Sequence, residues 1–159
     1  MATKFVQRDA LGPSQYTGSH SGISVDSDDN LLKVNVDGTQ RPYATAYVKN
    51  LTASATATPV DSGTMYIADS TTSVVVTLPS TAVGLQYTLV VGQLTSSGGH
   101  AFSPAAADKI MGGGTTAVDN KDIICSAASD RDGDAITVVA DGIDGWYITS
   151  VSGTWAAES

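Results

Sequence analysis

The sequence predicts an all-β fold, an antiparallel β-sandwich or barrel of the jelly-roll-like kind with an extended N-terminal arm. Of its 159 residues, 42% are hydrophobic, only 15% are charged and 16 are glycine, a composition that favours short strands and turns over helices. Short apolar runs alternate with polar residues, and turn residues recur about every ten positions. No segment carries a helical apolar stripe of useful length.

The arm is expected over residues 1–45. Residues 1–24 are rich in Gly, Ser, Gln and Thr and keep no hydrophobic period, which is typical of a segment that cannot bury itself alone. In "NLLKVNVDGTQRPYATAYV", Leu32, Val34 and Val36 alternate with polar residues, and an Asp-Gly turn follows them. This pattern predicts a β-hairpin within the arm.

The body is expected over residues 46–159. Residues 51–63 are small and rich in Thr and Ala, so they form either a linker or a first, lightly packed strand. The strand-like runs that follow are "TMYIA", "SVVVTLP", "GLQYTLVVGQL", Lys109–Met111, "DIICSA", "AITVVAD" and "WYITSVSGTW". Pro79 ends the second run because it cannot donate to a strand ladder. The third run places four residues on one face: Leu85, Tyr87, Leu89 and Val91.

Charge is concentrated in the body. Residues 1–50 hold five basic and five acidic side chains, whereas residues 51–159 hold three basic and eleven acidic ones, which accounts for the whole net charge of −8. An acidic body repels nucleic acid and anionic membranes, so neither is expected as a partner. The chain has no apolar run of about 18 residues and begins without an apolar signal-like segment. We therefore expect it to be made in the cytoplasm and not to span a membrane.

The candidate nucleophiles and bases give little support to catalysis. His20 and His100 lie in Ser- and Gly-rich stretches and are expected to be solvated loop residues, with no nucleophile motif beside them. Cys125, the single cysteine, has no disulfide partner and is expected to be a small buried hydrophobe. We expect no catalytic residue, no cofactor and no enzyme activity.

An aspartate cluster leaves two interpretations open. Asp130, Asp132 and Asp134 follow the spacing of a calcium-binding loop that would continue to Asp141. The sixth position of that loop, however, is Ala135 rather than the glycine that makes the sharp bend, and strand-like runs flank it. The pattern favours a plain hairpin turn over a calcium site.

Both tryptophans fall in the closing stretch "DGIDGWYITSVSGTW". Trp146 follows a tight turn and is expected to begin the last strand and cover the core. Trp155 lies at the far end of that stretch, where its ring caps the core or contacts a neighbouring subunit. A carbohydrate cage built from these rings is the third possibility.

Three segments, taken in order, resemble a known family. "TLPSTAVGLQYTLVV", "SPAAADKIMGGG" and "ITVVADGIDGWYITSVSGTW" are similar to the β-rich domain of structural proteins of tailed bacteriophages, particularly capsid decoration (cement) proteins and also some tail-fibre proteins. The resemblance covers residues 60–155. Each motif consists mostly of turn glycines and strand hydrophobes, so their order carries the specificity.

The resemblance implies a non-enzymatic virion protein on the outer capsid surface of a tailed phage. Its implied partners are the major capsid protein and further copies of itself in a homotrimer, and the arm, residues 1–45, is expected to dock on the capsid. The expected capsid-binding residues are Phe5, Arg8, Tyr16, Lys33, Arg41 and Tyr43. Trp155 is the candidate for the contact between subunits.

Two other classes of function remain as alternatives. A tail-fibre or receptor-binding module would recognise a host-surface glycan through exposed aromatic residues and would sit at the tail rather than over the head. A hydrolase on a β-scaffold would lose its activity when one Asp or His is replaced, and it has the weakest support from motifs.

Overall fold

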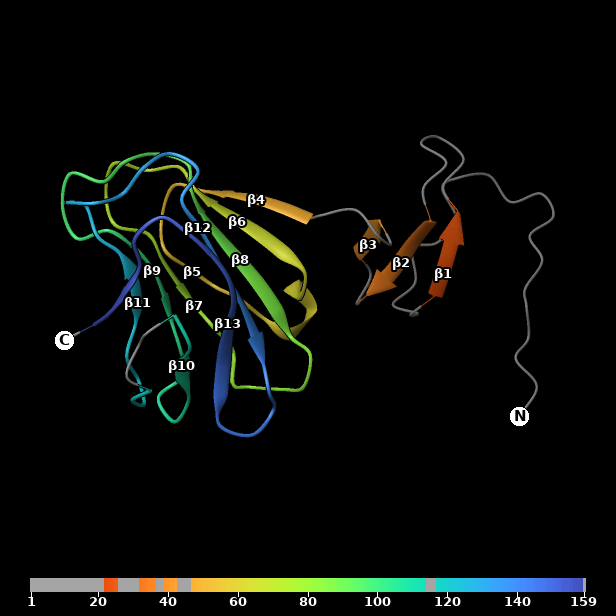
Figure 1. The fold of residues 1–159 in the computed structure, drawn as a ribbon. Coiled ribbons are helices and arrows are strands. Elements are labelled where there is room, and N and C mark those ends of the chain that lie inside the picture. Colours follow the sequence, from red (N-terminus) through yellow and green to blue (C-terminus); the bar gives the residue numbers. More distant parts are fainter. Residues whose placement is uncertain (1–21, 26–31, 37–38, 43–46, 114–116, 159) are drawn as a thin grey trace. The chain divides into compact units, whose positions relative to one another are not determined.

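A computed structural model describes residues 22–25, 32–36, 39–42, 47–113 and 117–158 (Figure 1). The chain divides into two compact units, residues 1–45 and residues 46–159.

The first unit contains a three-stranded antiparallel sheet in the order β1-β2-β3. Its strands are β1 (Gly22–Val25), β2 (Leu32–Val36) and β3 (Thr39–Pro42). Val36 pairs with Thr39, so β2 and β3 confirm the predicted hairpin. The strand β1 was not predicted. The rest of the extended segment expected over residues 1–24 lies outside the described residues.

The second unit is built from two mixed sheets. A six-stranded sheet has the order β10-β13-β12-β8-β6-β4, and a five-stranded sheet has the order β14-β11-β9-β7-β5. The strands of the first are β4 (Tyr47–Leu51), β6 (Thr64–Ala68), β8 (Gln86–Val91), β10 (Lys109–Met111), β12 (Ala135–Ala140) and β13 (Gly145–Ser152). Those of the second are β5 (Ala55–Thr56), β7 (Val75–Thr77), β9 (His100–Ser103), β11 (Ile123–Cys125) and β14 (Ala156–Ala157).

From β4 to β9 the chain passes from one sheet to the other at every step. Each strand then pairs in parallel with the strand two places before it: β4 with β6, β6 with β8, β5 with β7, and β7 with β9. The expected all-antiparallel arrangement is wrong for these pairs and for β10 with β13. The reason is the path of the chain, because an excursion through the opposite sheet returns each strand in the direction of its predecessor.

Antiparallel pairing begins once the chain turns back. β12 pairs antiparallel with both β8 and β13, and β11 pairs antiparallel with β9 and β14. The predicted strands "TMYIA" and Lys109–Met111 are confirmed at their predicted bounds as β6 and β10. The ambiguous stretch 51–63 holds the short strand β5 and a single 3₁₀ turn, Pro59–Asp61.

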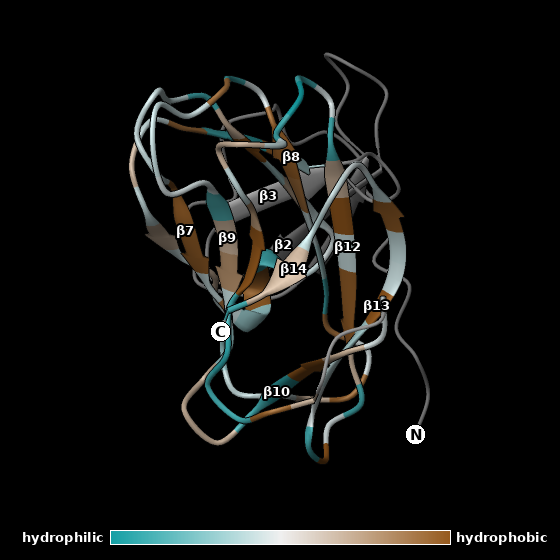
Figure 2. Cartoon of the chain, turned by 60° about the vertical axis from the view of Figure 1, so that its left-hand side comes forward, coloured by the Kyte–Doolittle hydropathy of each residue, from teal (hydrophilic) through white to brown (hydrophobic). Residues whose placement is uncertain are grey.

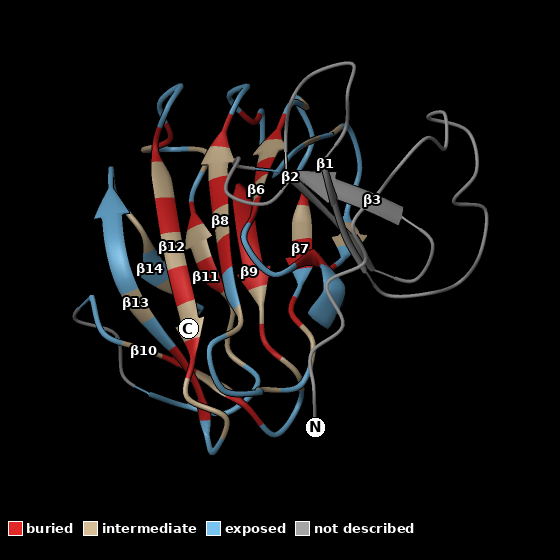
Figure 3. Cartoon of the chain, turned by 90° about the vertical axis from the view of Figure 1, so that its right-hand side faces the viewer, coloured by how far each residue is buried: buried red, intermediate tan, exposed pale blue. Residues whose placement is uncertain are grey.

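Both sheets contribute to one hydrophobic core. Buried and less buried positions alternate along β6, β8 and β12, as Figure 3 shows, and hydrophobic positions line β7, β8 and β12 in Figure 2. The large apolar and aromatic side chains that are fully buried include Tyr66, Tyr87, Leu89, Ile136 and Trp146 from the six-stranded sheet and Val76, Phe102 and Ile123 from the five-stranded sheet. Each such side chain contributes about 1.5–3 kcal/mol through burial.

Trp146 confirms the prediction that it covers the core. It is 0% exposed at the start of β13, and its ring centroid lies 5.5 Å from that of Tyr87 with the planes tilted by 49°. The Tyr87 hydroxyl donates a hydrogen bond to the Thr58 carbonyl at 2.7 Å. Burial, with Asp61 nearby, raises the pKa of Tyr87 to about 12.

Candidate interaction surfaces

His100 is a buried strand residue, so the expectation of a solvated loop histidine is wrong. It is 0% exposed in β9. Its Nδ1 accepts a hydrogen bond from the Val74 amide at 3.2 Å, which leaves the proton on Nε2 to be donated to the Gln93 carbonyl at 2.8 Å. Both ring nitrogens are therefore occupied by backbone groups from outside β9. His20 lies outside the described residues.

Cys125 is buried in β11, as the sequence predicted. Its cross-strand neighbour is His100, and its Sγ lies 3.8 Å from the Asp134 carboxylate. Burial, followed by the charges of Asp134 and Asp130, raises the pKa of the thiol to about 12. A thiol held protonated in this way is a poor nucleophile.

The carboxylates of the aspartate cluster hold loops together. Asp130 is 3% exposed and accepts hydrogen bonds from the Thr95 amide at 2.8 Å and the Thr95 hydroxyl at 3.1 Å. Asp134 is 8% exposed and accepts the Arg131 amide at 3.0 Å. Within the described residues, no three His, Cys, Asp or Glu side chains gather as a metal site would require. Residues 131–134 do form a turn, since the Asp134 amide donates to the Arg131 carbonyl at 3.0 Å. The expected hairpin is wrong, because β11 and β12 on either side of this loop belong to different sheets.

Asp141 holds the turn before β13 in place. Oδ1 of Asp141 accepts the amides of Ile143 at 2.8 Å, Asp144 at 3.0 Å and Gly145 at 3.1 Å. These three hydrogen bonds, the one from Ile143 first, lower the pKa of Asp141. The Thr81 hydroxyl joins the same network, accepting the Gly142 amide and donating to the Gly145 carbonyl, each at 3.0 Å.

The joined loops present two aliphatic side chains, Val83 and Ile143, which we call the aliphatic tip. They are 83% and 87% exposed, the highest values among the large hydrophobic residues that the structure describes. The backbone of Gly142 lies against Val83, since a Cβ built there would be 2.5 Å from the valine side chain. Nearby, Lys109 pairs with Asp144 at 2.8 Å and with Asp119 at 3.7 Å. Exposed apolar residues on a rigid turn suit contact with another protein.

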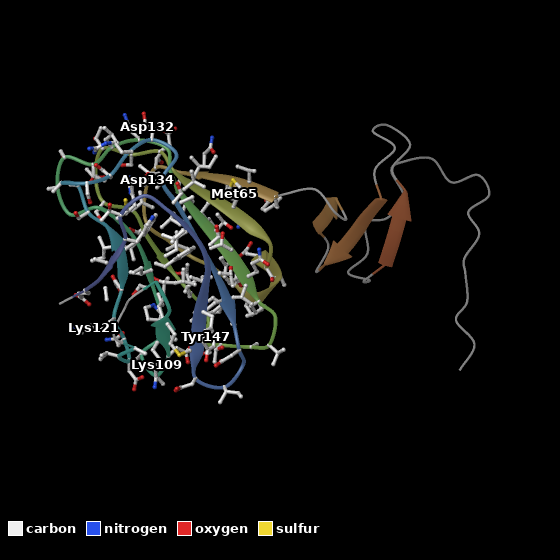
Figure 4. The ribbon with its side chains drawn as sticks, in the orientation of Figure 1. Met65, Lys109, Lys121, Asp132, Asp134 and Tyr147 are labelled. Carbon is white, nitrogen blue, oxygen red and sulfur yellow. The ribbon has the colours of Figure 1, made fainter. Side chains whose placement is uncertain are left out.

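On its outward side, the six-stranded sheet forms a broad surface without charge from β4 to β13, which we call the outer face. The strand register aligns its residues in three rows: Val48, Met65, Thr88, Thr137 and Ser150; Asn50, Ile67, Val90, Ala135 and Ser152; Gln86, Val139 and Tyr147. All are partly or fully exposed. Figure 4 shows Met65 and Tyr147 from this face, together with Asp132 and Asp134 at one end of the body and Lys109 at the other.

One edge of the same sheet holds a pair that the sequence did not predict. Lys49 of β4 contacts the Asp61 carboxylate at 2.7 Å, and Asp61 is 4% exposed. The same carboxylate accepts the amide and hydroxyl of Thr58 at 2.9 and 2.7 Å. The lysine also lies over the rings of Tyr47 and Tyr66, at 5.7 and 5.8 Å. No local motif marks this pair, because its members come together only when β4 joins β6.

The structure does not describe the side chains of the predicted capsid-binding residues. Phe5, Arg8, Tyr16 and Tyr43 lie outside the described residues. Lys33 belongs to β2 and Arg41 to β3, where only the backbone is described. Trp155 packs partly buried against the core of its own chain, and its Nε1 donates to the Ser152 carbonyl at 2.9 Å.

Neither the known protein-family models nor the curated proteins contain a match to this chain. Among the described residues, no helix has the length and apolar character needed to cross a membrane.

Proposed function

We propose that the protein is a structural, non-enzymatic component of a tailed-phage virion that binds the major capsid protein on the outer surface of the head. In this proposal, residues 46–159 are a β-sandwich body that associates as a homotrimer, and residues 1–45 are the docking arm. The chain is made in the host cytoplasm and assembles onto the capsid. The starting point is the resemblance of residues 60–155 to capsid decoration proteins.

The observation that carries the proposal is that the potentially reactive side chains of the body are buried and bonded within the fold. His100, Cys125 and Asp130 are buried, and each bonds to or contacts groups that join separate strands or loops. Side chains committed in this way stabilise a scaffold rather than activate a substrate. The remaining surface consists of acidic loops and a broad uncharged face, which favours binding to proteins over chemistry.

The proposed mechanism is mechanical. The arm adds strands or extended contacts across neighbouring capsid subunits, as peptides do when they extend an exposed sheet edge. Several arms on one oligomer then bind together, and their linkage raises the effective concentration of each contact. The occupied capsid resists the outward pressure of packaged DNA better than the bare one.

Co-sedimentation with decoration-free capsids of the parent phage tests this function. The full-length protein should bind in a fixed ratio to capsid subunits. The double variant Lys33→Glu/Arg41→Glu should bind at least about tenfold more weakly, since it reverses two of the charges proposed to bind the capsid. A matched control, Lys121→Glu/Arg131→Glu, makes the same change of charge on the body and should bind like the wild type.

Equal binding by both double variants would remove the arm from the interface. Failure of the wild type to bind any capsid would overturn the decoration function. Capsids with and without bound protein should then be compared for the temperature at which they release DNA, which should rise on binding.

The glycan-binding alternative has one observation in its favour. Tyr47 and Tyr147 are 37% and 50% exposed on the body, and aromatic rings stack on sugars. Trp146, the ring most suited to such a site, is fully buried. A copy number per virion that matches tail fibres rather than capsid subunits, together with binding on a glycan array, would favour this alternative.

A further inference from the structure

We propose that the outer face of the six-stranded sheet is the surface through which one copy of this chain binds a second copy. Because the same face meets on both copies, this contact is two-fold and closes as a dimer, so the inference goes beyond the homotrimer proposed above and does not depend on it. Whether the protein binds capsids is a separate question, and the experiment below keeps the two apart.

The first step is the composition of the face. The strands β4, β6, β8, β12 and β13 contain a single charged residue, Lys49, which lies in the inward row beside Tyr66 and is paired with Asp61. None of the outward positions on these five strands is charged, and Lys109, which shares the outward side on the edge strand β10, is paired with Asp144 and Asp119. Sheet surfaces that face water ordinarily carry charged side chains, which also prevent unwanted association. A face depleted of charge is characteristic of the centre of a protein interface.

The second step is the low cost of removing this face from water. Thr88 and Thr137, neighbours at its centre, hydrogen-bond to each other through their hydroxyls at 2.9 Å. Polar groups that satisfy each other lose less on burial than groups bonded only to water. Met65, Ile67 and Val139 surround them, and Tyr147 and Val48 stand at opposite sides, 50% and 48% exposed. Methionine and tyrosine are both enriched at protein interfaces, methionine because its flexible chain fills irregular gaps and tyrosine because it joins a large apolar ring to a polar hydroxyl.

The third step identifies the occupant from the charge pattern. Residues 46–159 carry eleven acidic side chains against four basic ones, and every acidic residue lies outside the five strands of the face. A partner with a basic surface would bind best at the acidic loops, where attraction is available. A second copy carries the same negative charge and is repelled there. The uncharged face is the broad surface on which two such bodies can meet without opposing like charges.

The fourth step is geometric. Two sheets pack face to face at about 10 Å, with side chains from both interdigitating. The outer face spans the five strands from β4 to β13, each bonded to the next. Paired with a second copy, it forms a continuous sheet-on-sheet contact of the kind found inside β-proteins. Salt should strengthen this contact, because it screens the repulsion between the acidic loops of the two copies.

Analytical ultracentrifugation of the full-length protein over a wide concentration range tests the inference. The wild type should associate, and added NaCl should tighten the association. Thr137→Asp at the centre of the face should raise the dissociation constant at least about 100-fold, because the contact buries an unpaired charge. Tyr147→Asp, at a half-exposed position, provides a second variant that the fold tolerates readily. Thr77→Asp, exposed on β7 of the other sheet, adds the same charge elsewhere and should associate like the wild type.

Thermal unfolding shows which variants are folded, and capsid co-sedimentation of the same proteins separates the outcomes. Face variants that associate as tightly as the wild type would overturn the assignment of the face and leave self-association through another surface standing. A wild type that stays monomeric throughout would overturn the inference. If such a monomer needs Thr137 and Tyr147 to bind capsids, the outer face binds the capsid protein instead of a second copy, and the decoration function stands. A wild type that associates through this face yet binds no capsid would leave the inference standing and overturn the decoration function.

Discussion

A single carboxylate oxygen fixes the turn that presents the aliphatic tip. Three amides converge on Oδ1 of Asp141, so the loop from Asp141 to Gly145 has little freedom to relax. An ionised carboxylate accepts such hydrogen bonds better than a neutral group does, which is why they lower its pKa. The exposure of Ile143 is therefore imposed by the turn and is not the result of a loose loop.

Asp141→Asn should lower stability at neutral pH, and the difference from the wild type should disappear in acid. The carboxyl has a folded-state pKa below its ordinary value of 3.8, so its contribution is fully present above the unfolded-state value and is lost as the pH falls through the folded-state value. Thermal melts between neutral pH and pH values below about 3 measure this. A gap that stays constant across this range would show that charge has no part in holding the turn.

His100 should prove structural when it is replaced. His100→Phe keeps a ring in the site but leaves the Val74 amide and the Gln93 carbonyl without their partner. Each unpaired buried group costs about 1–3 kcal/mol, so the free energy of unfolding should fall by at least about 2 kcal/mol. His100→Gln, which keeps one donor and one acceptor, should lose less. Urea denaturation of the two variants tests this, and equal losses would contradict the assigned hydrogen bonds.

At the scale of elements, the parallel pairing of β10 with β13 depends on one glycine. Gly145 opens β13 opposite Lys109, and a Cβ at this position would lie 2.1 Å from the Lys109 carbonyl oxygen. Its φ of +156° is also unfavourable for other residues. Any side chain would push β10 away and with it Ile110, which is 4% exposed in the core. The closing strand can accept β10 only because its first residue has no side chain.

Gly145→Ala should therefore destabilise the protein by on the order of 3 kcal/mol, through both the clash and the loss of core packing. Gly63→Ala is the matched control. Gly63 also has a positive φ, +86°, but open space surrounds its missing side chain, so only the backbone preference of about 1 kcal/mol is lost. Chemical denaturation of both variants compares them. If Gly63→Ala proves as costly as Gly145→Ala, close approach of β10 is not what requires glycine.

At the scale of the whole molecule, the sequence predicted where strands lie better than how they pair. The alternation of Tyr87, Leu89 and Val91 marks β8 because every other side chain enters the core. The same alternation occurs in strands of either sheet, so it cannot show that Thr64 pairs with Tyr87 in parallel. That pairing follows from the path between the sheets, which no local pattern records.

Local sequence patterns likewise predicted only some features of the candidate sites. Burial of Cys125 was predictable from its apolar neighbours in "DIICSA". His100 was not, because the groups that bond its ring come from Val74 and Gln93, outside its own short strand. The outer face shows the limit most clearly: each strand reveals its own uncharged positions, but only the register shows that they join into one surface.

The uneven charge of the body should make its stability depend on salt. Lysines pair with Asp61, Asp119, Asp144 and Glu158 in the part of the chain that the structure describes, and the acidic residues outnumber such partners. Repulsion among carboxylates opposes the compact state, and dissolved ions screen it. The thermal midpoint should rise by a few degrees as NaCl is added, at protein concentrations low enough to prevent association. NaCl is preferable to sulfate, which stabilises proteins by exclusion from their surface.

Two single-charge variants decide whether this dependence arises from net charge. Asp132 is exposed in the same turn as the buried carboxylates Asp130 and Asp134, so Asp132→Asn should raise the thermal midpoint at low salt and weaken its response to NaCl. Lys121→Gln removes one of the few positive charges, near Glu158, and should lower the midpoint and strengthen the response. Opposite shifts that converge at high salt are expected, because screening removes both effects together. Shifts in the same direction would mean that local contacts, rather than the acidic surplus, set the response of this fold to salt.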